Sequence, residues 1–166
     1  MQVLIVRHAA AVPSGTGGIH EEERPLTAEG RAKFEAAARG LARLLAAPDV
    51  LLSSPLKRAR QTAEIAARAW GDRPVSFDAA LAGEDLDAIA RLLARQPREA
   101  SVALFGHEPT VSSLVAHLLG LESAEAVSFK KGTAALVETS DPAASGSGRL
   151  VWFLSPGALR AVGGED

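Results

Sequence analysis

Short apolar runs alternate along this chain with longer segments of helical period, and that alternation limits the possible folds more than any other feature. The apolar runs are four to six residues long and contain β-branched side chains, as buried strands do. Strands that alternate with helices predict an α/β domain with a mostly parallel central sheet. The predicted strands are residues 2–7, 49–53, 74–77, 101–105, 133–138 and 150–154. The first, second and fourth are the most apolar, so we expect them at the centre of the sheet.

The segments between the strands carry apolar side chains every three or four positions, which predicts helices that bury one face. These helices cover residues 28–45, 55–70, 84–95 and 109–119. The clearest stripes are Phe34, Ala38, Leu41 and Leu45, and Val111, Leu114, Val115 and Leu118. His117 lies off the second stripe, so we expect solvent exposure there. Trp70 and Trp152 end or interrupt apolar runs and are predicted to lie in the core.

Length and charge limit the classes of function. A chain of 166 residues, 47% hydrophobic and 23% charged, has the size and composition of a single globular domain over residues 1–166. Its 18 Lys and Arg residues face 20 Asp and Glu residues, which leaves a formal charge of -2. Binding to a phosphate backbone needs an excess of positive charge, so nucleic acid is not an expected partner.

The absence of cysteine excludes disulfides, thiolate metal sites and thiol nucleophiles. The chain starts directly with an apolar strand, without a basic leader or a cleavage site, and no apolar run is long enough to span a membrane. We therefore expect a cytoplasmic protein without a membrane partner.

Two segments interrupt the alternation of strands and helices. Residues 12–25 follow a strand end and contain a Ser-Gly-Thr-Gly-Gly stretch, which is typical of a mobile rim or lid. Residues 140–148 are rich in Ser, Gly, Ala and Pro and separate two predicted strands, which predicts a flexible hairpin connection. His20 lies in the first of these loops, and we expect it at the surface.

Polar side chains stand at the ends of three predicted strands. Arg7 and His8 end and follow the first strand, Ser54 follows the second, and Gly106 and His107 follow the fourth. In an open parallel sheet, ligands bind in the crevice outside the carboxyl ends of the strands. We therefore expect these side chains to converge on one crevice.

The second strand end also supplies a cation. Ser54 and Pro55 have the pattern of an N-cap and a first helical residue, which would place Arg58 at the fourth helical position. Helical side chains lean toward the N-terminus, so Arg58 can reach over the crevice. Pro109 has the same helix-starting role after His107. Two helix N-termini directed at one place form an anion site.

A phosphoryl group fits such a site. Arg7 and Arg58 can bind its oxygens with two parallel hydrogen bonds each, which suits guanidinium better than ammonium groups. A neutral His8 offers a ring nitrogen as nucleophile, and His107 can donate a hydrogen bond to the oxygens that gather charge. A phosphohistidine on His8, later hydrolysed by water, requires neither metal nor cofactor.

Four motifs resemble the histidine phosphatase superfamily, and more narrowly its bacterial phosphohistidine phosphatases of the SixA type. They are LIVRH at residues 4–8, RPLT at 24–27 followed by Gly30, SPLKRARQT at 54–62, and GHEP at 106–109. The similarity extends to Trp152, Ser155 and Pro156, so it covers almost the whole chain.

This resemblance implies a nucleophile motif at Arg7 and His8, a second phosphate-binding arginine at Arg58 and a second histidine at His107. It also implies a phosphoglycerate mutase-like α/β/α sandwich of three layers, with one antiparallel edge strand. The chain is too short for the helical insertions of the longer mutases, which makes a mutase the weaker expectation.

Two features depart from the family pattern. Ala9 stands where the superfamily usually has glycine, which adds a methyl group beside His8 and predicts a narrower pocket. The general acid of longer relatives, a carboxylate after the third strand, has only Glu84 and Asp85 as candidates, with Glu84 the first choice. Both also fit the ordinary role of acidic residues at a helix start, which we favour.

The uncertain acid bears on the substrate. An alkyl phosphate gains about 10²–10⁴-fold from a proton donor, whereas the imidazole of phosphohistidine, with a pKa near roughly 6.5, can leave protonated without one. We therefore predict a metal-independent phosphatase that hydrolyses phosphohistidine, with a phosphorylated protein as partner.

Two alternatives remain open. One is a broad phosphomonoesterase that acts on small phosphorylated molecules, and the other is a catalytically silent module that only binds phosphate. Nucleotide binding through residues 15–18 is weaker still, because neither G-x-G-x-x-G nor a Walker lysine is present.

Overall fold

A computed structural model of the chain describes residues 1–164. Its centre is one six-stranded sheet in the order β3-β2-β4-β1-β5-β6. The strands are β1 (Gln2–Arg7), β2 (Val50–Ser53), β3 (Val75–Phe77), β4 (Ser101–Gly106), β5 (Ala134–Thr139) and β6 (Gly148–Leu154). All six agree with the predicted strands to within two residues, and the three most apolar ones, β2, β4 and β1, lie side by side in the interior of the sheet.

The sheet is mostly parallel, as predicted, but its antiparallel strand is not at the edge. Strands β1, β4, β2 and β3 pair in parallel, and β5 pairs antiparallel with both β1 and β6. The reason is the hairpin between β5 and β6, which reverses the chain once more. The edge strand β6 therefore runs in the same direction as β1.

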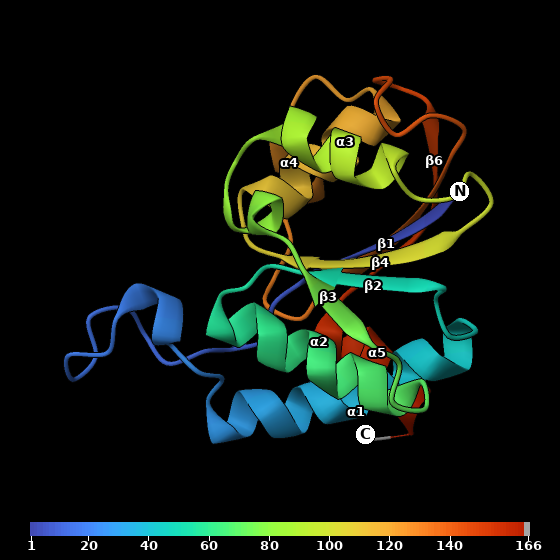
Figure 1. Cartoon of the computed structure of the whole chain (residues 1–166). Coiled ribbons are helices and arrows are strands. Elements are labelled where there is room, and N and C mark those ends of the chain that lie inside the picture. The colour runs from blue at the N-terminus through green and yellow to red at the C-terminus, as the bar shows by residue number, and fades with distance from the viewer. Residues whose placement is uncertain (165–166) are drawn as a thin grey trace.

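Helices cover both faces of the sheet and confirm the three-layer sandwich (Figure 1). On one face lie α1 (Ala28–Leu44), α2 (Lys57–Ala69) and α5 (Pro156–Gly163), and on the other lie α3 (Leu86–Ala94) and α4 (Thr110–Leu119). Three short 3-10 helices lie in the connections, at Glu21–Glu23, Ala79–Ala82 and Ala124–Val127.

Helix α5 was not predicted, because its eight residues are too few to show a periodic stripe. Local chemistry nevertheless starts it: the Ser155 hydroxyl accepts from the backbone N–H of Ala158, and Pro156 occupies the first turn. Gly163 lets α5 lie close against α1, since a Cβ there would be 2.3 Å from the carbonyl oxygen of Ala36.

Each face of the sheet has its own apolar core. The predicted α1 stripe is buried except for Leu45, which packs against the core from its rim, and the α4 stripe is fully buried. Trp70 is buried and donates to the carbonyl oxygen of Leu45 at 3.3 Å, whereas Trp152 is only partly buried. His117 is half-buried rather than exposed, and its Nε2 atom is buried; the turn at Gly146 packs on this end of α4, where its N–H donates to the carbonyl oxygen of His117.

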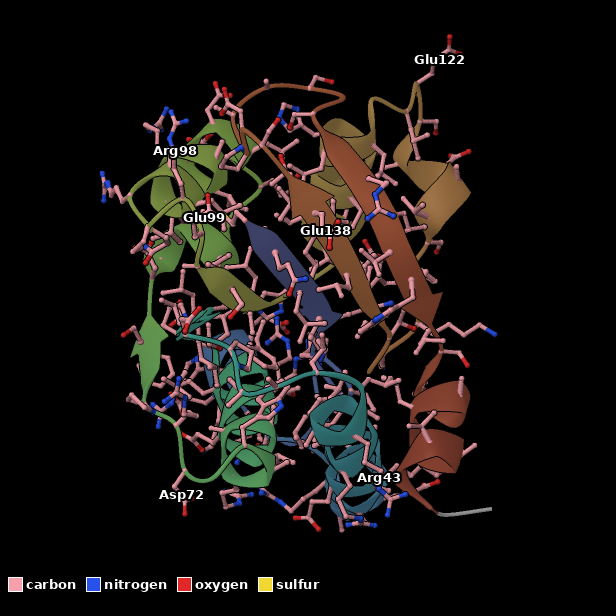
Figure 2. The ribbon with its side chains drawn as sticks, turned by 90° about the vertical axis from the view of Figure 1, so that its right-hand side faces the viewer. Arg43, Asp72, Arg98, Glu99, Glu122 and Glu138 are labelled. Atoms are coloured by element: carbon pink, nitrogen blue, oxygen red, sulfur yellow. The ribbon has the colours of Figure 1, made fainter. Side chains whose placement is uncertain are left out.

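The two ends of the sheet differ in character. At the carboxyl end of β1, residues 12–25 project as a loop away from the body of the protein (Figure 1). An isolated bridge between Ala11 and Leu26 closes this loop at its base. Figure 2 views the opposite end, where Arg98, Glu99 and Glu138 lie.

No helix within residues 1–164 is long and apolar enough to cross a membrane.

Candidate active site

The carboxyl ends of β1, β2 and β4 bring the predicted side chains into one place. His8 and His107 are 6% and 8% exposed, and their ring centroids lie 5.1 Å apart. Arg58 is 6% exposed, and its charge, like that of Arg7, acts on both imidazoles. The four residues that the sequence singled out therefore lie together at the carboxyl end of the central strands.

His8 is held in one tautomer by its own chain. Its Nδ1 atom lies 2.7 Å from the carbonyl oxygen of Ala9. A carbonyl oxygen only accepts, so Nδ1 carries the proton and Nε2 keeps its lone pair. Burial lowers the pKa of His8 to about 3; the hydrogen bond to Ala9 opposes this shift, and the charges of Arg58 and Arg7 reinforce it. His8 is therefore a neutral imidazole at physiological pH, with Nε2 available as a nucleophile.

The backbone around His8 is fixed from two sides. The N–H of Ala9 donates to Thr62 Oγ1 at 3.1 Å, and Thr62 in turn donates to the carbonyl oxygen of Arg58 at 2.7 Å. On the other side, the N–H of Gly132 donates to the carbonyl oxygen of His8 at 3.1 Å. These bonds tie the segment after β1 to the first turn of α2.

Helix α2 begins later than predicted, and the difference changes the role of Ser54. Its first residue is Lys57 and its N-cap is Leu56, so Arg58 is the second helical residue rather than the fourth. Ser54 instead accepts from the N–H of Leu56 at 3.2 Å while its hydroxyl lies 2.8 Å from Nε2 of His107. The prediction missed this because a Ser-Pro pair fits a capping turn and a short bend equally well.

His107 receives its orientation from that serine. Ser54 Oγ accepts from a backbone N–H and can still donate its own proton to Nε2 of His107; in that arrangement the imidazole proton is on Nδ1. Nδ1 is buried and has no hydrogen-bond partner. Burial lowers the pKa of His107 to about 4, helped by the charges of Arg58 and Arg24.

Each arginine is anchored by one part of its guanidinium group. Arg7 donates from Nη1 to the carbonyl oxygen of Phe129, whose N–H is held by the Glu108 carboxylate at 2.8 Å. Arg58 donates from Nη1 to the carbonyl oxygen of Glu21 at 2.8 Å, and its Nη2 lies 3.2 Å from the Glu21 carboxylate. The Nε atoms of Arg7 and Arg58 are buried without a partner.

These unpaired groups are concentrated at one site. Within residues 1–164, four buried side-chain nitrogen or oxygen atoms lack a hydrogen-bond partner, and three of them are Arg7 Nε, Arg58 Nε and His107 Nδ1. Arg7 Nε and Arg58 Nε are N–H donors, and His107 Nδ1 is a third donor when Ser54 donates to Nε2. Buried donors are normally paired, so this cluster indicates a place for an acceptor such as a phosphoryl group.

Two further residues of the site were not assigned a role from the sequence. Arg24 donates from Nε to the Glu21 carboxylate at 2.8 Å and from Nη1 to the carbonyl oxygen of Val12 at 2.6 Å. Hydrogen bonds from Arg24 and Ser14 lower the pKa of Glu21 to about 2. Arg24 was visible in the RPLT motif, but Glu21 lies in a run of three glutamates without any distinguishing pattern.

The two acid candidates lie at the start of α3. Asp85 is the N-cap of that helix and accepts from the N–H of Ala88 at 3.0 Å, which is the structural role favoured from the sequence. Glu84 is exposed. Its neighbour Gly83 accepts from Thr110 Oγ1 at 2.8 Å, which places this segment beside the start of α4, at the end of the sheet that holds His107.

Ala9 and Gly30 shape the surroundings of His8. The methyl group of Ala9 packs in the core under α1, where Phe34 also lies, so it adds to that core. A Cβ at Gly30 would be only 2.2 Å from the carbonyl oxygen of Ala10. Glycine is therefore required for the first turn of α1 to approach the segment after His8.

The residues that could bind a metal do not gather in the described part of the chain. Residues 1–164 contain no group of three or more His, Asp or Glu side chains placed to hold a metal ion. Of the four histidines, two are in the site, His117 is on α4, and His20 is exposed in the projecting loop.

Known proteins resemble this chain in sequence and in fold. The chain belongs to the histidine phosphatase superfamily, and residues 3–88 match branch 1 of that family. An uncharacterized protein of Picosynechococcus sp. (strain ATCC 27264 / PCC 7002 / PR-6) is 30% identical over 152 residues, which cover 85% of this chain and 92% of that protein.

Within the superfamily, the fold is similar to SixA proteins. The structure of the protein histidine phosphatase SixA complexed with tungstate has a TM-score of 0.83 and 29% identity, and covers 96% of this chain and 99% of that one. A SixA structure from Agrobacterium tumefaciens has a TM-score of 0.79 and 27% identity, and covers 93% and 97%.

Proposed function

We propose that this protein hydrolyses phosphohistidine, carried by another protein, through a covalent phosphohistidine intermediate on His8. The observation that carries the proposal is the set of three unpaired buried donors around the neutral imidazole of His8. Such a set complements a phosphoryl group and leaves the nucleophile uncharged. The similarity of the chain to SixA proteins supports the same chemistry.

The first step is transfer of the phosphoryl group to the enzyme. The lone pair of His8 Nε2 attacks phosphorus in line, and the bond from phosphorus to the leaving nitrogen of the substrate breaks. Arg7 and Arg58 bind the equatorial oxygens through their Nε and remaining Nη hydrogens, and His107 donates from Nδ1. The electron pair of the broken bond stays on the substrate imidazole, which takes up a proton from solvent.

The second step returns His8 to its starting state. A water molecule attacks the phosphorus atom, the bond to His8 Nε2 breaks, and the product leaves as dihydrogen phosphate, which releases a proton to the solvent as its own acid–base equilibrium requires. His8 regains the Nε2 lone pair, and its Nδ1 proton stays hydrogen-bonded to the Ala9 carbonyl oxygen throughout. The low pKa of His8 favours this step, because a weakly basic imidazole is a good leaving group.

The leaving group favours phosphohistidine over phosphate esters. Asp85 caps a helix and the Glu21 carboxylate is held ionised by its neighbours, so neither is suited to donate a proton. An alkoxide needs such a donor, whereas an imidazole does not. Glu84 is exposed and follows Gly83, which contacts the start of α4, so a proton donated by Glu84 would give the alternative of a broad phosphomonoesterase.

The remaining parts of the proposal follow from this chemistry. We propose that residues 1–166 act as one histidine phosphatase domain in the cytoplasm, without metal or cofactor. The partner is a protein with a phosphorylated histidine at an accessible surface.

A substrate panel tests the proposal. The purified protein is assayed with a histidine-phosphorylated protein, a phosphotyrosine peptide and a sugar phosphate, in the presence of a chelator. We expect the highest kcat/KM on the first, and a labelled phosphoenzyme that is trapped by rapid quenching and absent in the His8→Ala variant. A phosphoenzyme that survives in His8→Ala would place the nucleophile elsewhere.

The panel also separates the alternatives. Preference for the sugar phosphate, abolished by Glu84→Gln, would identify a small-molecule phosphomonoesterase with Glu84 as the acid. Binding of phosphate without release of phosphate from any donor would identify a silent binding module. Loss of turnover on addition of the chelator would contradict the metal-independent mechanism.

A further inference from the structure

A hollow lies beside the candidate active site, on the side of the sheet that α1 and α5 cover. It has a volume of about 200 Å³. Its apolar floor is formed by Ala9, Phe34, Ala37 and Pro156. In Figure 1, α1 and α5 lie next to each other below the sheet, with the projecting loop beyond the start of α1. The mechanism above uses none of the side chains that line this hollow.

Three cations from three different elements line the hollow. Lys33 comes from α1, Lys131 from the connection before β5, and Arg160 from α5. Lys33 is paired with Glu29 one turn earlier on the same helix. The side chains of Lys131 and Arg160 have no acidic partner within the described residues 1–164. This cavity, which we name the α1–α5 cavity, therefore carries excess positive charge in a chain whose formal charge is -2.

The cavity is fixed relative to the nucleophile. Gly132, which lines it, donates its N–H to the carbonyl oxygens of both Arg7 and His8, at 3.2 and 3.1 Å. Ala9 and Ala10, the next residues after His8, also line it. A ligand in this cavity therefore lies at a constant position with respect to a phosphoryl group on His8.

We propose that the α1–α5 cavity binds an acidic side chain of the phosphoprotein whose phosphohistidine occupies the active site. The charges of Lys131 and Arg160 match a carboxylate, and the apolar floor matches the methylene groups that carry it. This inference rests on the proposed function, because it assigns a second contact to the same substrate.

The exposure of the cations in the α1–α5 cavity favours a carboxylate attached to a bound substrate over a free anion. Around His8 the donors are buried and rigidly held, but here Lys33 and Lys131 are exposed and Arg160 is half-exposed. Exposed charges bind a free anion weakly. The same weak contact becomes effective when the anion belongs to a molecule already held at the active site, because the second contact is then intramolecular.

The test compares two substrates with one double variant. Lys131→Gln with Arg160→Gln removes the two unpaired charges, and Lys130→Gln with Arg149→Gln is the matched control, which removes the same charge outside the cavity. The substrates are a protein phosphorylated on a histidine flanked by acidic residues, and free phosphohistidine. We expect the cavity variant to raise KM for the protein about tenfold, with kcat unchanged, and to leave the kinetics of free phosphohistidine unaltered.

The substrate provides a second arm. When the flanking acidic residues of the phosphoprotein are replaced by amides, wild-type enzyme should show the same tenfold rise in KM, and the cavity variant should add no further effect. Equal losses on both substrates, an equal effect of the control pair, or an unchanged KM would overturn the proposal. Inhibition of free phosphohistidine hydrolysis by millimolar succinate, lost in the cavity variant, would show a free-anion site instead.

The experiment distinguishes a failure of the docking role from a failure of the proposed function. Wild-type turnover of the phosphoprotein is measured first. If the enzyme does not hydrolyse it, the proposed function fails and the docking role fails with it. If hydrolysis is normal and the cavity variant behaves as wild type, the docking role alone is wrong.

Discussion

The two arginines of the candidate site are held by very different parts of the molecule. Arg7 ends a central strand and donates to the carbonyl oxygen of Phe129, a fully buried residue. Arg58 starts a helix and is held by Glu21, whose side chain is 51% exposed, in the projecting loop. One side of the phosphate site is therefore set by the sheet, and the other depends on the position of a surface loop.

This difference suggests a division of tasks. Arg7, His8 and His107 are preorganised, because backbone bonds and buried neighbours fix them before any ligand arrives. Arg58 is held by Glu21, whose side chain is accessible to solvent and to an incoming partner. The predictions below test whether the two sides contribute equally to catalysis and differ only in how they are held.

The largest effect is expected from removing either arginine. Arg58→Ala and Arg7→Ala should each lower kcat by about 10²–10³-fold, because each removes donors to the charge of the transition state. Single-turnover kinetics with a histidine-phosphorylated protein measures this directly. If Arg58→Ala kept the wild-type rate while Arg7→Ala lost it, the loop-held side would have no part in the chemistry.

The next largest effect is expected from removing the hydroxyl group of Ser54, which orients His107. Ser54→Ala removes the partner of His107 Nε2, so the imidazole proton can occupy either nitrogen and less of the enzyme has Nδ1–H directed at the phosphoryl group. We expect kcat to fall about tenfold with little change in KM. Ser54→Thr keeps the hydroxyl and should restore the rate. Failure of that rescue would mean that Ser54 acts through packing.

The sheet side was also the part that the sequence could predict. Strand ends are visible as apolar runs that stop at polar residues, so Arg7, His8 and His107 follow from topology alone. The α5 helix was too short to show a period, and the hairpin after β5 decided which strand lies at the edge. Neither feature can be recognised from the spacing of residues in the sequence.

The loop side could not be predicted in the same way. The contact between Glu21 and Arg58 joins residues 37 positions apart, and on one side it involves a 3-10 helix of only three residues. The α1–α5 cavity likewise depends on how three elements pack, which single residues such as Lys131 and Arg160 do not reveal. Contacts of this kind are set by tertiary packing, where sequence periodicity carries no information.

A smaller effect is expected in the dependence of stability on pH. The folded state lowers the pKa of His8 to about 3 and of His107 to about 4, whereas both should be near roughly 6.5 in the unfolded chain. Between these values the unfolded state binds more protons, so stability falls as pH falls from about 6.5 toward 4. At pH 7 and above, neither state is protonated and the effect disappears.

Urea unfolding at pH 7 and pH 5 measures this linkage. The wild-type protein should lose about 1–2 kcal/mol more of its unfolding free energy over that interval than the His8→Asn variant, which lacks one of the two shifted groups. Comparing differences between the two pH values removes the intrinsic effect of the substitution on stability. Identical differences for both proteins would show that His8 titrates normally in the folded state.

The smallest effect should come from the exposed tether itself. Glu21→Gln removes a carboxylate that lies 3.2 Å from Arg58. That carboxylate repels a bound phosphoryl group in the wild-type protein. The backbone carbonyl of residue 21 continues to hold the Arg58 guanidinium in the variant. The inhibition constant of inorganic phosphate should therefore fall about threefold at low salt, and the difference should shrink at 0.5 M salt as the exposed charge is screened. Isothermal titration with phosphate gives the same quantity without turnover. A loss of activity as large as that of Arg58→Ala would instead make the Glu21 carboxylate the essential anchor, and both sides of the site would then depend on an ion pair at the surface.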